Sequence, residues 1–168
     1  MHTPTVASPR AGSRETPVPA YLAGFLLIGL GLSVAGPALS HLRDRVHTTD
    51  GGIAWLFVGQ SAGYILGSVF AGHGLDSGRG HRRWVAAMVG ATCSIVLIAL
   101  APSLALLVAA FAVLGGACGL CDVSGHTLVM WNRPEGPGAL HNALHLCFAN
   151  GAMDTPISFT TGFTVEWG

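Results

Sequence analysis

Charged side chains are scarce in this 168-residue chain, and lysine is absent. Only 10% of the residues are charged, whereas 51% are hydrophobic and the mean hydropathy is +0.56. This is too little charge to coat a soluble globule of this size, so the composition indicates that lipid surrounds most of the chain. Eight arginines balance eight acids. The zero net charge gives no basic surface for nucleic acid, and we expect no nucleic-acid partner.

Cysteine is also sparse, with four residues that all lie in apolar runs. In such runs a small buried hydrophobic role is expected rather than a disulfide framework. Cys118 and Cys121 have the spacing of a redox pair, which makes a membrane thiol oxidoreductase one alternative function. Thiols in apolar surroundings are usually inert, however, and the loops carry no further cysteine. We therefore expect no enzyme activity and no cofactor.

Long apolar runs predict an all-α membrane protein with about five transmembrane helices. The first run is longer than the core of a signal peptide, so we keep it as a helix, with a kink near its outer end at Pro37. Asp50 is placed to cap the second helix. Pro102 interrupts about 38 uncharged residues and predicts a tight hairpin there. The expected spans are about residues 20–42, 52–72, 84–101, 103–131 and 139–156.

The two ends of the chain differ in character from the apolar spans. Residues 1–18 are polar, contain proline and show no periodicity, which predicts a disordered cytoplasmic tail. Residues 158–168 are more polar than a completed span, so we interpret them as a truncated or divergent tail. Residues 19–157 form the expected transmembrane bundle.

The positions of the arginines predict the orientation in the membrane. With the amino terminus in the cytoplasm, only Arg43 and Arg45 lie outside, as the positive-inside rule favours. The localisation we expect is a multi-pass protein of the plasma membrane. The arginines expected on the cytoplasmic side are Arg10, Arg14, Arg79, Arg82, Arg83 and Arg133.

Small residues recur at helical spacing along the second and fourth spans. Gly59, Gly63 and Gly67 are four residues apart, and Gly115 and Gly119 repeat that spacing. Such repeats allow helix backbones to approach closely inside a membrane. We expect them to mark tightly packed helix pairs.

An acidic residue, Asp122, lies within the fourth span. It shares one helix face with Gly119, Gly125 and His126, and His126 follows it by one turn. An ionisable side chain is costly in hydrocarbon, so it marks a functional site by default. The functional interpretation is a carboxylate that binds a proton or a cation in a central cavity. The structural alternative is an acid held in a hydrogen bond between helices.

Polar side chains also cluster at the start of the fifth span. His141, Asn142 and His145 lie on one side of this helix, where they can bind a polar solute or make interhelical hydrogen bonds. The spacing of His141 and His145 resembles that of a metal-ligand pair. No third ligand is evident in the sequence, so we expect no metal site.

The segment between the second and third spans carries Gly72, Asp76, Arg82 and Arg83. It resembles the glycine, acid and paired-arginine loop found at this place in the major facilitator superfamily. In the fourth and fifth spans, Asp122-Val-Ser-Gly-His126 and the segment from His141 to Ala152 resemble the fucose-proton symporter family, in particular its sodium-dependent glucose transporter-like branch. That branch usually has Asn where His126 stands and Gly where Ala149 stands.

The resemblance covers about residues 20–153. It implies a secondary transporter built from two six-helix halves, with the solute bound between them near mid-membrane. On this basis the chain is an incomplete amino-terminal half that lacks its carboxy-terminal partner. The implied solute is small and polar, such as a sugar, and the driving ion is a proton or sodium. The site residues would be Asp122, His126, Asn142 and His145. A membrane assembly or regulatory subunit without transport activity is the alternative function.

Overall fold

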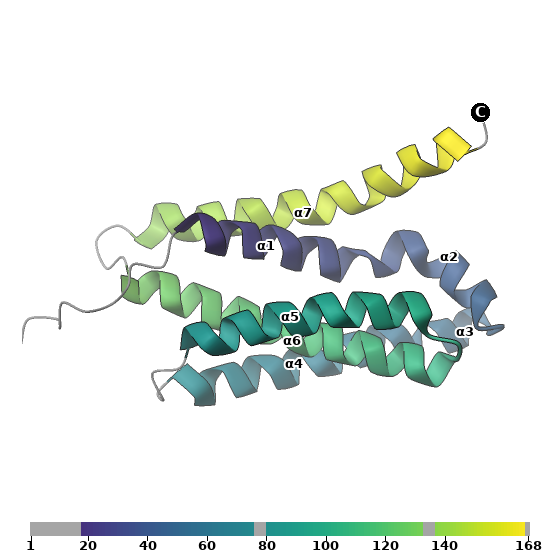
Figure 1. The fold of residues 1–168 in the computed structure, drawn as a ribbon, viewed down its shortest axis with the longest axis horizontal. Helices are drawn as coiled ribbons and strands as arrows, with labels where there is room; N and C mark the ends of the chain where they lie inside the picture. The colour runs from purple at the N-terminus through teal and green to yellow at the C-terminus, as the bar shows by residue number, and fades with distance from the viewer. Residues whose placement is uncertain (1–17, 76–79, 133–136, 167–168) are drawn as a thin grey trace, which may run out of the picture.

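The computed structural model describes residues 18–75, 80–132 and 137–166, and within these ranges all regular secondary structure is α-helical. The chain folds into a bundle of roughly parallel and antiparallel helices (Figure 1). This confirms the all-α prediction. The helices are α1 Val18–Ser33, α2 Ala35–Arg45, α3 Asp50–Ile53, α4 Trp55–Leu75, α5 Gly80–Leu100, α6 Leu104–Asn132 and α7 Pro137–Glu166.

Three segments of the described chain are long and apolar enough to cross a membrane. They are Asp50–His73, Gly80–Leu100 and Leu104–Trp131, and the bent pair α1 and α2 adds a fourth if it is counted as one span. Helix α7 is not among these candidates, because polar residues such as Asn142 and Asn150 interrupt its apolar character. It nevertheless remains helical as far as Glu166, beyond the predicted end of the fifth span at residue 156.

The first span is bent, as Pro37 predicts. Helices α1 and α2 meet at Val34 with an angle of 42°. Proline has no backbone N–H, so it cannot donate to the carbonyl of Ser33 four residues earlier. The helix resumes with a long bond of 3.4 Å from Ala38 N to the Val34 carbonyl.

The second span begins differently from the prediction. Thr49, not Asp50, is the N-cap, because its hydroxyl oxygen accepts from Gly52 N at 3.1 Å. Asp50 is instead the first helical residue, and its carboxylate accepts from Arg43 at 2.7 Å. The hydroxyl of threonine is short enough to reach back to the backbone, while the acid one residue later finds a cation beside it.

The predicted hairpin between α5 and α6 is confirmed. Helix α5 ends at Leu100 and α6 begins at Leu104, with Pro102 between them. Arg45 of α2 donates to the carbonyl oxygens of Ala99, at 2.8 Å, and Ile98, at 2.5 Å. These are otherwise unpaired acceptors at the negative end of the α5 dipole, so Arg45 caps this helix from outside.

The closest helix pairs are α4 with α6 and α1 with α7. A Cβ on Gly63 would collide with the Ala112 carbonyl, and a Cβ on Gly151 would collide with the Leu26 carbonyl. Glycine is therefore required at both crossings, which confirms the predicted packing role of the small residues in the α4–α6 pair.

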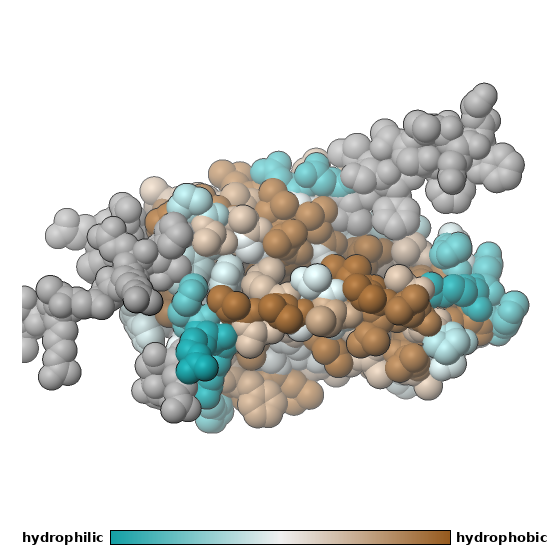
Figure 2. Space-filling view, viewed as in Figure 1, coloured by the Kyte–Doolittle hydropathy of each residue, from teal (hydrophilic) through white to brown (hydrophobic). Residues whose placement is uncertain are grey.

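On the face shown in Figure 2, the middle of the bundle is largely apolar, and hydrophilic side chains gather toward its two ends. Large hydrophobic side chains of the bundle are exposed, among them Phe70 at 66% and Leu100 at 73%. Such exposure would be costly in water and is expected for a surface that faces lipid. Arg82 and Arg83 begin α5 at one end of the bundle, and Arg43 and Arg45 lie at the other (Figure 1). This separation is the one that the orientation prediction requires.

Candidate functional site

Asp122 lies in α6 and is held by side chains on both sides. Its Oδ2 accepts a hydrogen bond of 2.6 Å from the Tyr64 hydroxyl of α4, and its Oδ1 lies 3.2 Å from His126 Nδ1. The side chain is 28% exposed. The carboxylate thus has one partner on a neighbouring helix and one on its own, and it keeps an accessible side.

The backbone geometry behind this contact is set by Gly119. A Cβ at this position would collide with the Tyr64 carbonyl and would lie 2.8 Å from Ser68 Oγ. Because the residue is glycine, α6 approaches α4 closely enough for the Tyr64 hydroxyl to reach Asp122 one turn further along α6. The glycine spacing and the acid within the span therefore belong to one arrangement.

Tyr64 also lines a small cavity of about 350 Å³ on the α4 side. Its polar lining comes from Gln60, Ser61 and Tyr64 of α4. Gln60 is buried, with 8% of the residue exposed, and its side-chain amide donates to the Leu32 carbonyl at 3.4 Å. The volume lies at the lower end of the range for small-molecule sites. The amide and hydroxyl groups of this lining can donate to and accept from the hydroxyls of a polar solute.

Gln60 and Tyr64 were not among the site residues predicted from the sequence. The available signal was their position: two hydrogen-bonding side chains one turn apart inside an otherwise apolar span. That pattern alone does not show whether the pair faces lipid, another helix or a cavity.

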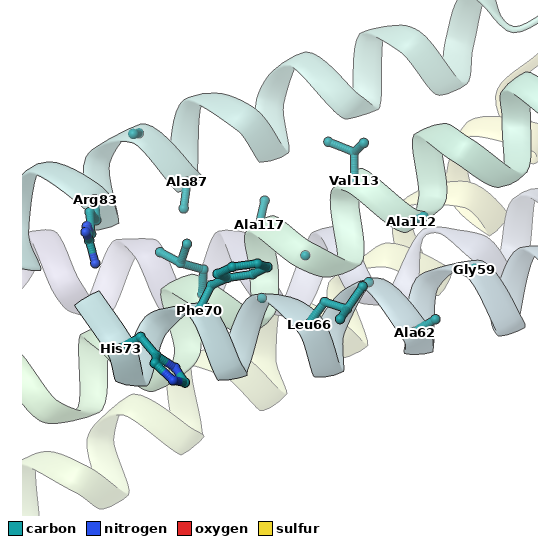
Figure 3. Close-up of a pocket in the computed structure, with 15 residues that line it drawn as sticks. Gly59, Ala62, Leu66, Phe70, His73, Arg83, Ala87, Ala112, Val113 and Ala117 are labelled. Atoms are coloured by element: carbon teal, nitrogen blue, oxygen red, sulfur yellow. The ribbon is translucent and has the colours of Figure 1, made fainter. Parts of the chain in front are cut away.

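A larger groove of about 850 Å³ runs between α4, α5 and α6 (Figure 3). Leu66 and Phe70 of α4 and Val113 and Ala117 of α6 line its length. Arg83 lies at one end, together with His73. An apolar lining offers few groups that could hold a polar solute, so we do not assign this groove to the solute.

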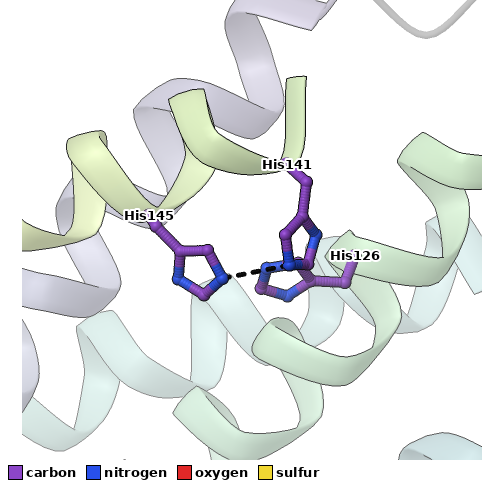
Figure 4. Close-up of side chains that lie close together, drawn as sticks. All are labelled: His126, His141 and His145. Carbon is purple, nitrogen blue, oxygen red and sulfur yellow. Dashed lines mark hydrogen bonds between the residues drawn. The ribbon is translucent and has the colours of Figure 1, made fainter. Parts of the chain in front are cut away.

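Three histidines meet between α6 and α7 (Figure 4). His145 Nε2 lies 3.1 Å from His141 Nε2, and one nitrogen from each of these residues and from His126 lies within 4.8 Å of the others. The sequence showed no third ligand for the pair on α7, but the tertiary fold brings His126 to it from another helix. Asn142 lies on α7 beside them and is exposed.

The family model of the Major Facilitator Superfamily matches residues 21–135. The match covers more than half of the chain. The chain belongs to the Major Facilitator Superfamily.

Several curated proteins are similar to it over most of its length. Sodium-dependent glucose transporter 1 of Homo sapiens is 30% identical over 137 residues, which are 80% of this chain and 26% of that protein. The proteins of the same name from Xenopus laevis and Danio rerio are each 29% identical, over 76% and 82% of this chain and 26% and 23% of their own lengths. The chain thus spans about a quarter of these relatives. No solved structure matches it significantly.

Membership of the superfamily gives a context for the segment between α4 and α5. The structure places Gly72 in the last turn of α4, and Arg82 and Arg83 in the first turn of α5. The sequence placed these three residues in a loop, whereas the structure makes them helical. Asp76 lies outside the described residues. Cations at the start of a helix oppose its dipole, so the helix itself gives no reason for the arginine pair.

The two cysteines of the redox alternative are buried in the superfamily fold. Cys118 and Cys121 are each 1% exposed, and the Cys121 thiol contacts the Trp84 carbonyl at 3.7 Å. A reactive dithiol needs access to its partner and to solvent. The burial favours a packing role for both residues.

Proposed function

We propose that this chain contributes the amino-terminal part of a secondary transporter that moves a sugar with a coupled cation. The observation that carries the proposal is the hydrogen bond of 2.6 Å from Tyr64, which lines the small cavity, to Asp122. The names of the relatives support sodium as the coupled ion and glucose as the solute. The proposed location is the plasma membrane, and the arginine bias supports an orientation with the amino terminus in the cytoplasm.

In this proposal Asp122 binds the coupling cation, and Gln60 and Tyr64 bind hydroxyl groups of the sugar. A carboxylate in a low-dielectric span attracts a cation strongly, which offsets the cost of placing the acid there. Tyr64 contacts both the acid and the cavity. A cation on Asp122 would therefore act directly on the hydrogen-bond partner that lines the solute site, and this contact is the route of coupling that we propose.

The remainder of a superfamily transporter would supply the second wall of the cavity. Solutes of this class bind between two repeats near the midplane, and this chain corresponds to about a quarter of each relative. We therefore expect residues 1–168 alone in liposomes to show no concentrative glucose uptake. Robust concentrative uptake by this chain alone would contradict the proposal that the second wall comes from the rest of the transporter, and it would favour a homo-oligomeric transporter.

A chimera provides the direct test. Residues 20–153 would replace the matching segment of the human relative, and cells expressing the chimera would be assayed for glucose accumulation in sodium and in choline buffers. We expect accumulation that requires sodium. Asp122→Asn should abolish it while leaving solute exchange at equilibrium, whereas His126→Asn should have a much milder effect. Asp44→Asn, an exposed acid on α2, is the matched control.

Two outcomes would reject the assignment. If the Asp122→Asn chimera reaches the cell surface and accumulates glucose at the parental rate, the acid is a structural hydrogen-bonding residue. If the parental chimera reaches the surface but carries no glucose in either buffer, the solute assignment fails.

A further inference from the structure

The histidine cluster of α6 and α7 has the features of a transition-metal site. His126 extends from α6, and His141 and His145 extend from successive turns of α7 toward it (Figure 4). The ring of His126 lies 4.6 Å from that of His141 and 5.1 Å from that of His145, measured between centroids. Imidazole nitrogens are the preferred ligands of zinc and other late first-row metals, whereas sodium prefers oxygen.

Hydrogen bonding selects the nitrogen that His126 can offer. Its Nδ1 lies 2.9 Å from the Asp122 backbone carbonyl and 3.2 Å from Asp122 Oδ1, and both of these groups are acceptors. Nδ1 therefore carries the proton, and in the neutral ring the lone pair is on Nε2. An imidazole held through its other nitrogen by a carboxylate is the usual arrangement of a metal-bound histidine.

The free nitrogen of His126 has no partner among the described residues. Nε2 is buried and makes no hydrogen bond there. A buried polar atom without a partner is costly, and a ligand that it binds would remove the cost. A metal in the cluster satisfies Nε2 and simultaneously separates the two nitrogens of His141 and His145.

The distances suit a four-coordinate ion. Zinc binds imidazole nitrogen at about 2.0–2.1 Å, which places two ligands of a tetrahedral site roughly 3.3 Å apart. The pair on α7 is at 3.1 Å, and all three nitrogens lie within 4.8 Å of one another. His145 is exposed, so its side chain has room to complete the geometry, and the fourth position is left for water.

We propose that His126, His141 and His145 bind a divalent transition metal of the zinc type and that the metal fastens α7 to α6. Helix α7 packs mainly on α1 and has only a small interface with α6. A metal bridge would add a fixed contact between the two helices. His126 is six residues from the end of α6, about 9 Å along its axis, so the ion enters from the end of the bundle where α6 and α7 are joined.

This site goes beyond the proposed transport function and does not depend on it. The sugar cavity is formed by α1 and α4, while the metal would lie between α6 and α7. Asp122 is shared, because it orients His126 on one side and accepts from Tyr64 on the other. A metal on His126 would therefore hold one oxygen of Asp122 in place and restrain the coupling acid.

The test uses the whole chain in detergent micelles without a histidine tag, with Cys93→Ser to remove an exposed thiol that could compete. Titration calorimetry with zinc chloride should show one site per chain. His145→Ala should weaken binding by about 100-fold, and Asp122→Asn by about 10- to 100-fold. His41→Ala, an exposed histidine on α2, should bind zinc as the parent does.

Thermal unfolding and visible absorption provide two further measurements of the site. Zinc should raise the thermal midpoint of the parent but not that of His145→Ala, since only the intact cluster can join the helices. Cobalt in place of zinc should give the visible absorption of a four-coordinate nitrogen site. Because His145 is exposed, its substitution leaves the core intact, and circular dichroism checks the fold.

The proposal is overturned if the parent binds no zinc, or if His145→Ala and His41→Ala bind it equally well. The experiments separate a failure of the metal-site proposal from a failure of the transport proposal. Zinc binding without glucose accumulation by the chimera would leave the metal site standing alone. Sodium-dependent accumulation without zinc binding would leave only the transporter.

Discussion

The hydrogen bond between Tyr64 and Asp122 can be weighed on the isolated chain by a pair of matched substitutions. Tyr64→Phe removes the hydroxyl that donates to Asp122 Oδ2 at 2.6 Å. Tyr21→Phe removes a buried hydroxyl that finds no hydrogen-bond partner in the described part of the chain. Both changes delete one oxygen atom and keep the ring, so they differ chiefly in the interaction that is lost.

The expected magnitudes are distinct. Hydrogen bonds to charged groups contribute about 1.5–3 kcal/mol in soluble proteins, and interhelical bonds in membranes average about 0.6 with a maximum near 1.7 kcal/mol. We therefore expect Tyr64→Phe to lower the free energy of unfolding by about 1–2 kcal/mol. Tyr21 is 1% exposed and packs edge-on against Trp84 at 5.1 Å. Since Tyr21→Phe keeps that packing, its effect should be about zero or slightly stabilising.

Reversible unfolding in mixed micelles of increasing sodium dodecyl sulfate content would measure both values. The double variant Tyr64→Phe with Asp122→Ala completes a cycle in which each single change removes the interaction, and it should show a coupling of about 1 kcal/mol. If Tyr64→Phe costs no more than Tyr21→Phe, or if the coupling is zero, the hydrogen bond does not stabilise the site. The position of Asp122 would then need another explanation.

Other predictions follow from the packing and the orientation. Gly119→Ala should destabilise the bundle by about 1–3 kcal/mol, because the added methyl group collides with the backbone of α4. Gly72 has open space around it, so Gly72→Ala should be neutral or slightly stabilising in the same assay. Single cysteines would be introduced by Thr48→Cys and Ser77→Cys in a cysteine-free background and tested with an impermeant thiol reagent on intact cells. Only the cysteine at position 48 should react. Labelling at position 77 alone would mean that the topology is inverted. Arg45→Ala should lower the thermal midpoint by a few degrees, because the carbonyls at the end of α5 lose their cap, and an unchanged midpoint would show that water replaces it fully.

Much of the helical architecture could be predicted from composition and local pattern. Lipid-facing helices need long apolar runs, and Pro37 and Pro102 lack the N–H that a continuous helix requires, so the bend and the hairpin follow from the covalent chemistry of the chain. The error at the start of the second span was of one residue. Thr49 and Asp50 can both cap a helix. In the structure Asp50 accepts a hydrogen bond from Arg43, and Thr49 is the N-cap.

Asp122 could be singled out from the sequence because an acid is costly in a membrane whatever the fold around it. Its neighbour His126 could also be placed beside it by helical periodicity, but its partner on α4 could not. Tyr64 is 58 residues away, and its hydroxyl reaches the carboxylate only because of the close approach of α4 and α6 at Gly119. In the same way the sequence displayed His141 and His145 as a pair, while the third histidine depends on how α7 is rotated against α6. Helical periodicity determines which residues share a face of one helix, but the rotation and register of two helices are set by the packing of their whole surfaces, and only the tertiary structure decides them.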